Sequence, residues 1–75
     1  MNISKTDFDY MVDCLERDVA SILVEKDGYS IRQALDALYL SQTYQKIHNP
    51  ATGLYFQSPI YVYSCLMDEI KEKLA

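Results

Sequence analysis

The sequence has few of the residues that build metal, cofactor or disulfide sites. It contains no tryptophan, one histidine and two cysteines. Cys14 and Cys65 do not form a CxxC pair, and together with His48 they fall short of the four ligands of a structural zinc site. Two cysteines are also too few for the disulfide framework of a small secreted domain. We therefore expect free thiols in a cytoplasmic protein, with neither a metal nor a cofactor.

The sequence also lacks an uninterrupted apolar run of membrane-spanning length. Its first twenty residues hold five carboxylates, which is not typical of a signal peptide or a basic transit peptide. The stretch from Ile47 to Met67 carries no formal charge over twenty-one residues, which is long enough to cross a bilayer. It contains Pro50, Gly53 and Pro59, however, and these would leave backbone polar groups unsatisfied in lipid. We predict that no segment inserts into a membrane.

The sequence patterns of common catalytic sites are absent as well. Gly28 and Gly53 are the two glycines and each fits a turn, so no glycine-rich phosphate loop remains. There is no HExxH, GxSxG or EF-hand pattern. Cys14 and His48 have neither the spacing nor the context of a nucleophile with its base. We predict that the protein is not an enzyme and has no catalytic, cofactor-binding or metal-binding residues.

Negative charge is concentrated in the first part of the chain. Residues 1–28 carry three basic and seven acidic side chains, whereas residues 29–75 carry four of each and are neutral. Binding to a phosphate backbone depends on clustered lysine and arginine, so this distribution does not favour nucleic acid as a partner. An acidic chain suits solubility or a basic protein partner.

Apolar residues spaced three to four apart predict two helices in the first half of the chain. The first extends from an N-cap at Ser4 to a stop at Gly28. The second begins after Ser30, where Gln33 completes a capping box. The residues expected to face inward are Phe8, Met11, Val12, Leu15, Val19, Ile22 and Leu23, and then Ile31, Ala34, Leu35 and Leu38.

The apolar phase changes near Leu40. Either one helix is apolar on two faces, or the chain breaks there. Because Ser41 suits a new N-cap, we favour the break and predict a separate short helix to about His48.

The last part of the chain contains a turn, an extended segment and a helix. Residues 49–53 have turn composition, and residues 54–56 are expected to be extended. Ser58 and Pro59 are suited to the N-cap and first position of a helix. Its inward stripe is predicted to be Ile60, Tyr63, Leu66, Met67, Ile70 and Leu74. The sequence therefore predicts one all-α domain over residues 1–75, a compact bundle of three main helices plus one short helix.

Tyrosine supplies seven of the nine aromatic residues. The simpler interpretation is that these rings fill the half-buried rim of a small core. Tyrosine is also favoured at interfaces because it adds contact area at little cost in rotamer entropy. Tyr10 and Tyr61 project away from the apolar stripes of their predicted helices and are candidates for contact residues.

Part of the chain has a distinctive pattern. It consists of Ala34-Leu-Asp-Ala-Leu-Tyr39, then Ser41-x-Thr-Tyr44-x-x-Ile47, then Thr52-Gly-Leu-Tyr55-x-Gln-Ser-Pro59-x-Tyr-Val-Tyr63, with Leu66 and Glu69. The pattern resembles that of a family of short uncharacterised bacterial proteins, sometimes encoded near toxin–antitoxin-like gene pairs. The resemblance lends no catalytic residues. It implies that Thr43, Gln57 and Tyr61 are fixed by something other than local turn or cap chemistry.

These observations predict a small protein-interaction module, for which the resemblance implies an accessory or antitoxin-like role in a bacterial operon. The predicted protein-contact residues are Tyr44, Tyr55, Gln57 and Tyr61. We also expect a homodimer, because one thin helical layer leaves apolar residues to cover. These residues are Leu40, Tyr44, Ile47, Leu54 and Phe56.

The alternative function is that of a small helix-turn-helix DNA-binding regulator that uses the segment after Ser41. In that arrangement polar residues of the short helix face outward, namely Gln42, Thr43, Gln45, Lys46 and His48. Against it, Leu38 stands where the turn usually has a glycine, and the helix ends abruptly at Pro50.

Overall fold

The structure is a computed structural model that describes residues 3–74, with side chains to Lys73. Its α-helices are α1 (Lys5–Asp27), α2 (Ile31–Tyr39), α3 (Gln42–Ile47) and α4 (Pro59–Leu74). Two short 3-10 turns, η1 (Pro50–Thr52) and η2 (Leu54–Phe56), connect α3 to α4. The described residues contain no strand, and the predicted all-α bundle of three main helices and one short helix is confirmed. None of the helices within residues 3–74 has the length and apolar character to span a membrane.

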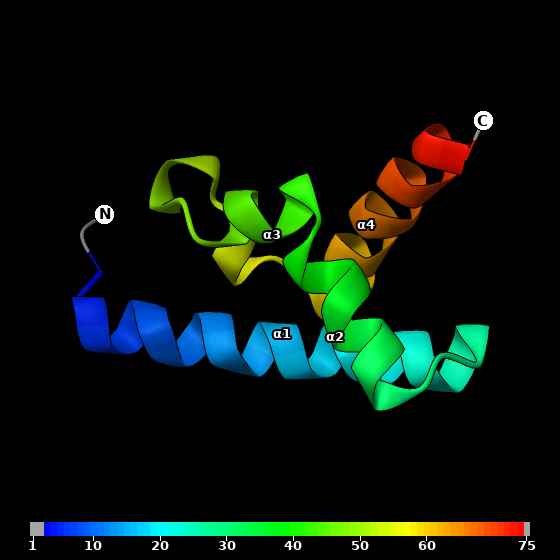
Figure 1. Ribbon diagram of the computed structural model, residues 1–75. Coiled ribbons are helices and arrows are strands. Elements are labelled where there is room, and N and C mark those ends of the chain that lie inside the picture. Colours follow the sequence, from blue (N-terminus) through cyan, green and yellow to red (C-terminus); the bar gives the residue numbers. More distant parts are fainter. Residues whose placement is uncertain (1–2, 75) are drawn as a thin grey trace.

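Helix α1 is the base on which the other elements pack (Figure 1). Helices α2 and α4 and the turn η2 all contact it, and α3 is held between α4 and the two turns. The last turns of α4 point away from α1, so that end of the helix is less covered than its beginning. This arrangement leaves the N-terminal half of α1 facing the connection between α3 and α4.

The ends of α1 and α2 are formed by the predicted capping residues. The Ser4 side chain accepts a hydrogen bond from the Asp7 amide at 3.1 Å, and Gly28 ends α1 in the left-handed conformation with a φ of 71°. Ser30 and Gln33 form a complete capping box, with bonds of 2.9 and 3.1 Å. The two serine caps satisfy amide groups that have no partner within the helix, and the Gly28 amide donates to the Leu23 carbonyl at the other end of α1.

The predicted break between α2 and α3 is confirmed. The Ser41 hydroxyl accepts a hydrogen bond from the Tyr44 amide at 3.0 Å and donates one to the Leu38 carbonyl at 2.5 Å. The break turns the chain so that both Leu38 and Ile47 are fully buried. A continuous helix would place these two side chains on opposite faces. Leu40, at the corner, is left 82% exposed.

One apolar core connects all four helices. Its centre on α1 is a row at the predicted spacing, and both Ala34 of α2 and Ile47 of α3 are fully buried against it. The buried apolar residues are Val12, Leu15, Val19, Ala20, Leu23, Ala34, Leu38, Ile47, Leu54, Val62 and Leu66.

Two predicted inward residues are in fact exposed. On α4 the buried row is Val62 and Leu66, both fully buried, whereas Ile60 is 48% exposed. Ile60 lies about 160° around the helix from Val62, so the face that packs on α1 turns it outward. On α2, Ile31 is 69% exposed because it borders an open hollow between α1 and α2. The side chain of Leu74, also predicted inward, lies outside the described residues.

The segment predicted to be extended, residues 54–56, is instead the 3-10 turn η2. Gly53 adopts a left-handed conformation with a φ of 69°, which reverses the chain before this segment. The Gln57 amide then donates to the Leu54 carbonyl at 3.2 Å and closes the turn. The turn buries Leu54 against the core and leaves Phe56 59% exposed.

Candidate interaction surface

The four predicted contact residues lie in different environments. Tyr44 is half-buried on α3, with its ring 5.2 Å from that of Tyr39 and 4.3 Å from that of His48. Partial burial raises the pKa of its phenol, and the nearby Glu16 carboxylate raises it further. His48 in turn contacts Glu16 through Nε2 at 2.7 Å. Tyr44 is therefore part of a polar-aromatic cluster that links α3 to α1.

Tyr55 and Gln57 lie together on the other side of the α3–α4 connection. The Tyr55 ring is 4.9 Å from Phe8 and 5.1 Å from Phe56, with edge-to-face geometry in both pairs. Gln57 is exposed and borders the same hollow along α1 as Tyr55. The structure thus brings two of the four residues to one surface.

Tyr61 is 52% exposed and faces a separate hollow, between α3 and α4. That hollow is lined by Thr43 and Glu69. The contact between them accounts for Thr43, a residue for which local turn and cap chemistry gives no structural role. Thr43 is 3% exposed, and both its amide and its hydroxyl donate to one Glu69 carboxylate oxygen, at 2.9 and 2.8 Å. The Thr43 side chain is therefore buried, although the helix-turn-helix alternative expected it to face outward.

Glu69 also accepts a hydrogen bond from the Gln42 amide at 2.8 Å and pairs with Lys73 at 3.2 Å. Partial burial alone would raise the pKa of this carboxyl group. The bonds from Gln42, Thr43 and Lys73 outweigh that effect and lower the pKa to about 2. Since its acceptor capacity is used inside the fold, Glu69 is a structural cap for α3.

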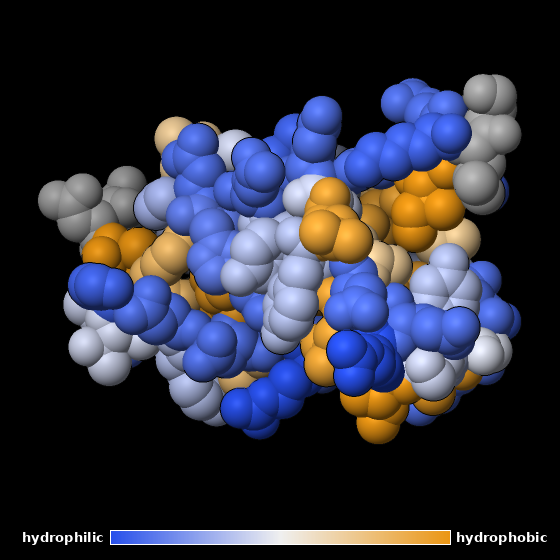
Figure 2. Space-filling model, in the orientation of Figure 1, coloured by the Kyte–Doolittle hydropathy of each residue, from blue (hydrophilic) through white to orange (hydrophobic). Residues whose placement is uncertain are grey.

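An open groove lies between α1 and the α3–α4 connection beside Tyr55, and we call it the aromatic groove. It consists of two adjoining hollows that share Met11, Tyr55 and Phe56. The larger, of about 830 Å³, lies between the first turns of α1 and residues 50–53. The smaller, of about 220 Å³, continues along α1 to Asp18 and is edged by Tyr10. The face turned toward the viewer in Figure 2 is mostly hydrophilic, with some apolar side chains near the start of α1 at the left of the view.

One face of α1 forms the floor of the aromatic groove. Asp7, Met11, Cys14 and Asp18 all line it, at the spacing i, i+4, i+7 and i+11. Eleven residues correspond to about three turns and leave a rotation of only about 20°, so the four side chains form one row. The two ends of the row are carboxylates and its middle is a thioether and a thiol.

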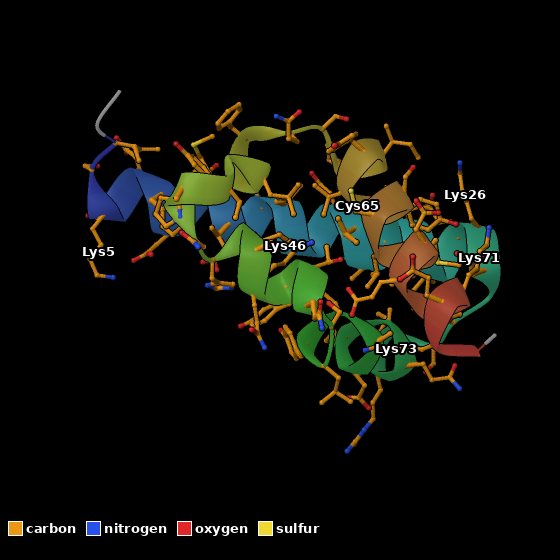
Figure 3. The ribbon with its side chains drawn as sticks, turned by 90° about the horizontal axis from the view of Figure 1, so that it is seen from above. Lys5, Lys26, Lys46, Cys65, Lys71 and Lys73 are labelled. Atoms are coloured by element: carbon orange, nitrogen blue, oxygen red, sulfur yellow. The ribbon has the colours of Figure 1, made fainter. Side chains whose placement is uncertain are left out.

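The charge along the groove has one sign. None of the described residues that line it is a lysine or arginine. Lys5 pairs with Asp9 at 3.1 Å, and Figure 3 shows it pointing away from the side of α1 on which η2 lies. Arg17 lines the hollow between α1 and α2 instead. Within the described part of the chain, neither Asp7 nor Asp18 is in an ion pair.

Sequence reasoning missed Phe56, Asp7 and Asp18 as members of this surface, and it placed Met11 in the inward stripe. The helical spacing of residues 7, 11, 14 and 18 indicates that they share one face of α1. It does not show which part of the chain lies across the groove from that face. In residues 3–74 no group of three or more histidine, cysteine, aspartate or glutamate side chains could hold a metal ion.

Comparisons with protein-family models, with curated proteins and with solved structures find no match to this chain.

Proposed function

We propose that the protein is a protein-interaction module and that the aromatic groove is the surface that binds its partner. The supporting observation is that Tyr10 and Phe56, 70% and 59% exposed, stand at the edges of a groove whose floor is apolar in its middle. Isolated exposed apolar residues are common on protein surfaces, so exposure alone carries little weight. Aromatic rings beside a concave apolar surface are typical of interaction sites.

The biological setting belongs to the same proposal. The resemblance of residues 30–70 to short bacterial proteins supports an accessory or antitoxin-like component of a bacterial operon, acting in the cytoplasm. Such a component would act by occupying a surface of another protein, which requires no catalytic group.

The helix-turn-helix alternative receives less support. Helix α3 has six residues, Thr43 is buried, and His48 is paired with Glu16. A recognition helix needs a row of free side chains long enough to reach several base edges. For this reason we make protein interaction the proposal.

The proposal is tested by affinity capture from the native host with matched variants. The test protein carries Tyr10→Ala and Phe56→Ala, and the control carries Ile31→Ala and Ile60→Ala. All four residues are exposed apolar side chains, but the control pair does not line the groove. We expect the groove variant to lose a partner that the wild type and the control retain.

Thermal melts must accompany the capture, since both variants should stay within about 1 kcal/mol of wild type as surface substitutions do. A partner retained equally by both variants would contradict the groove as the binding surface.

A further inference from the structure

The row of side chains on the floor of the aromatic groove points to the chemistry of the partner. We propose that the groove binds a basic amphipathic α-helix of another protein, with apolar side chains on Met11 and Phe56 and basic side chains opposite Asp7 and Asp18. This inference rests on the proposed function and goes further by naming the partner class. Its basis is the combination of an apolar middle with two carboxylates at the ends that form no ion pair within residues 3–74.

Charge complementarity identifies the sign of the partner. Asp7 and Asp18 are exposed, and no described basic side chain lines the groove beside them. A partner with lysine or arginine at matching positions would gain attraction at both ends, while an acidic partner would meet like charge. The uneven distribution of charge in the chain strengthens this effect, because residues 1–28 carry the whole net charge of −4.

The length and surroundings of the groove favour a helix over an extended peptide. Asp7 and Asp18 are about 16 Å apart along α1, at 1.5 Å per residue. A partner helix spans that length in three turns and presents side chains at the same i, i+4, i+7 and i+11 spacing. An extended peptide that binds by adding a strand needs a sheet edge, and the described residues contain no strand.

The test uses a fluorescent, alanine-rich helical peptide of about eighteen residues, long enough to form a helix. It carries lysine at the first and last positions of an i, i+4, i+7, i+11 row and leucine at the two middle positions, with glutamine on the other face. Two further peptides replace both lysines with glutamine or with glutamate. Affinity is measured by fluorescence anisotropy with the full chain at low and high salt.

We expect the lysine peptide to bind most tightly, the glutamine peptide more weakly and the glutamate peptide least. Asp7→Asn and Asp18→Asn should each weaken the lysine peptide about two- to five-fold, as expected for exposed charge pairs. Asp13→Asn is the matched control, because it removes the same charge from an exposed position of α1 that does not line the groove. Added salt should weaken only the lysine peptide through screening.

Phe56→Ala separates this inference from the proposed function. If the three peptides bind equally and Phe56→Ala weakens all of them, the groove is a docking site but the basic partner is wrong. If no peptide binds, or if the lysine peptide binds without sensitivity to Asp7, Asp18 and Phe56, the inference is overturned. In both cases the host capture with the Tyr10 and Phe56 variant still decides the proposed function independently.

Discussion

Three backbone amides at the start of α3 donate hydrogen bonds to two side chains. Ser41, directly before the helix, accepts from the Tyr44 amide, and Glu69 of α4 accepts from the amides of Gln42 and Thr43. The first amides of a helix have no intrahelical acceptor. In a helix of only six residues these bonds satisfy half of the amides. The position of α3 therefore depends on one carboxylate from a distant part of the chain.

Replacing Glu69 tests this dependence. Glu69→Gln should lower the free energy of unfolding by about 1–3 kcal/mol, because hydrogen bonds to a charged acceptor are stronger than those to an amide oxygen. Glu72→Gln, at an exposed position of the same helix, is the control and should change stability by less than about 0.5 kcal/mol. Urea unfolding curves measure both values.

The effect of Glu69 should also depend on pH. Its folded pKa, about 2, is below the value of 4.5 expected for an unperturbed carboxyl group. The charged form is therefore stabilised by folding, and this contribution is fully present above pH 4.5. It is lost as the pH falls toward 2, so the wild type and Glu69→Gln should converge in stability over that range. A difference that stays constant down to pH 2 would contradict the assignment.

At this scale the local contacts could be predicted from the sequence and the distant ones could not. Ser41 bonds to a residue three positions away, so its role follows from helix capping alone. Thr43 and Glu69 are twenty-six positions apart, and only the packing of α4 beside α3 brings them together. The pattern that includes both residues indicated that Thr43 was constrained, without showing by what.

Among the elements, the short helix α3 depends on the residue that directly precedes it. Ser41 is 3% exposed, and its hydroxyl both accepts from Tyr44 and donates to Leu38. Ser41→Ala should cost on the order of 1 kcal/mol through loss of the N-cap. Gln45→Ala, at an exposed position inside α3, is the control and should be neutral or slightly stabilising given the helix propensity of alanine. Equal urea midpoints for Ser41→Ala and wild type would show that the cap contributes nothing.

Helix α4 is correctly predicted in extent and most of its inward stripe contributes to the core, but the helix is rotated enough to bury Val62 and to expose Ile60. The wide distribution of apolar residues around the helix fits more than one inward face, and the contact with α1 selects the one centred on Val62 and Leu66. The aromatic groove could not be predicted for a related reason. Its floor lies on α1 and its opposite edge on η2, and the turn that joins them in space was expected to be an extended segment.

Substitutions on α4 distinguish the two orientations. Leu66→Ala should cost roughly 2–5 kcal/mol because it opens a cavity in the core. Ile60→Ala should cost less than about 1 kcal/mol, and so should the double variant Gln57→Ala, Tyr61→Ala, since all three side chains are exposed. Thermal or urea unfolding ranks them. If the double variant unfolds as easily as Leu66→Ala, Tyr61 has a structural role.

On the scale of the whole molecule, the fold covers some of its apolar residues and leaves others uncovered. Ile47 and Leu54, which we expected to contribute to a dimer, are buried by the chain itself. Leu40 remains 82% exposed. Fewer apolar residues are therefore available for self-association than the sequence indicated. The main one is Leu40, at the corner between α2 and α3.

We still expect the protein to form a dimer at micromolar concentration. Sedimentation equilibrium should give a mass above 8.7 kDa that rises with loading concentration. Leu40→Ser should lower that mass, because it removes the most exposed large apolar side chain, whereas Gln45→Ser should not. A mass of 8.7 kDa at every concentration would rule out the dimer.

The link between Glu69 and the start of α3 also has a consequence for synthesis on the ribosome. The chain emerges from its N-terminal end, so α1, α2 and the residues of α3 leave the ribosome before Glu69 has been added. Isolated helices shorter than about 12–15 residues are marginal in water, and α3 has six. A nascent chain that stops before Glu69 therefore holds the sequence of α3 without two of its three capping hydrogen bonds. Helix α3 is the third helix in order of synthesis, but it gains its full set of capping bonds only after Glu69 of the fourth helix has been added.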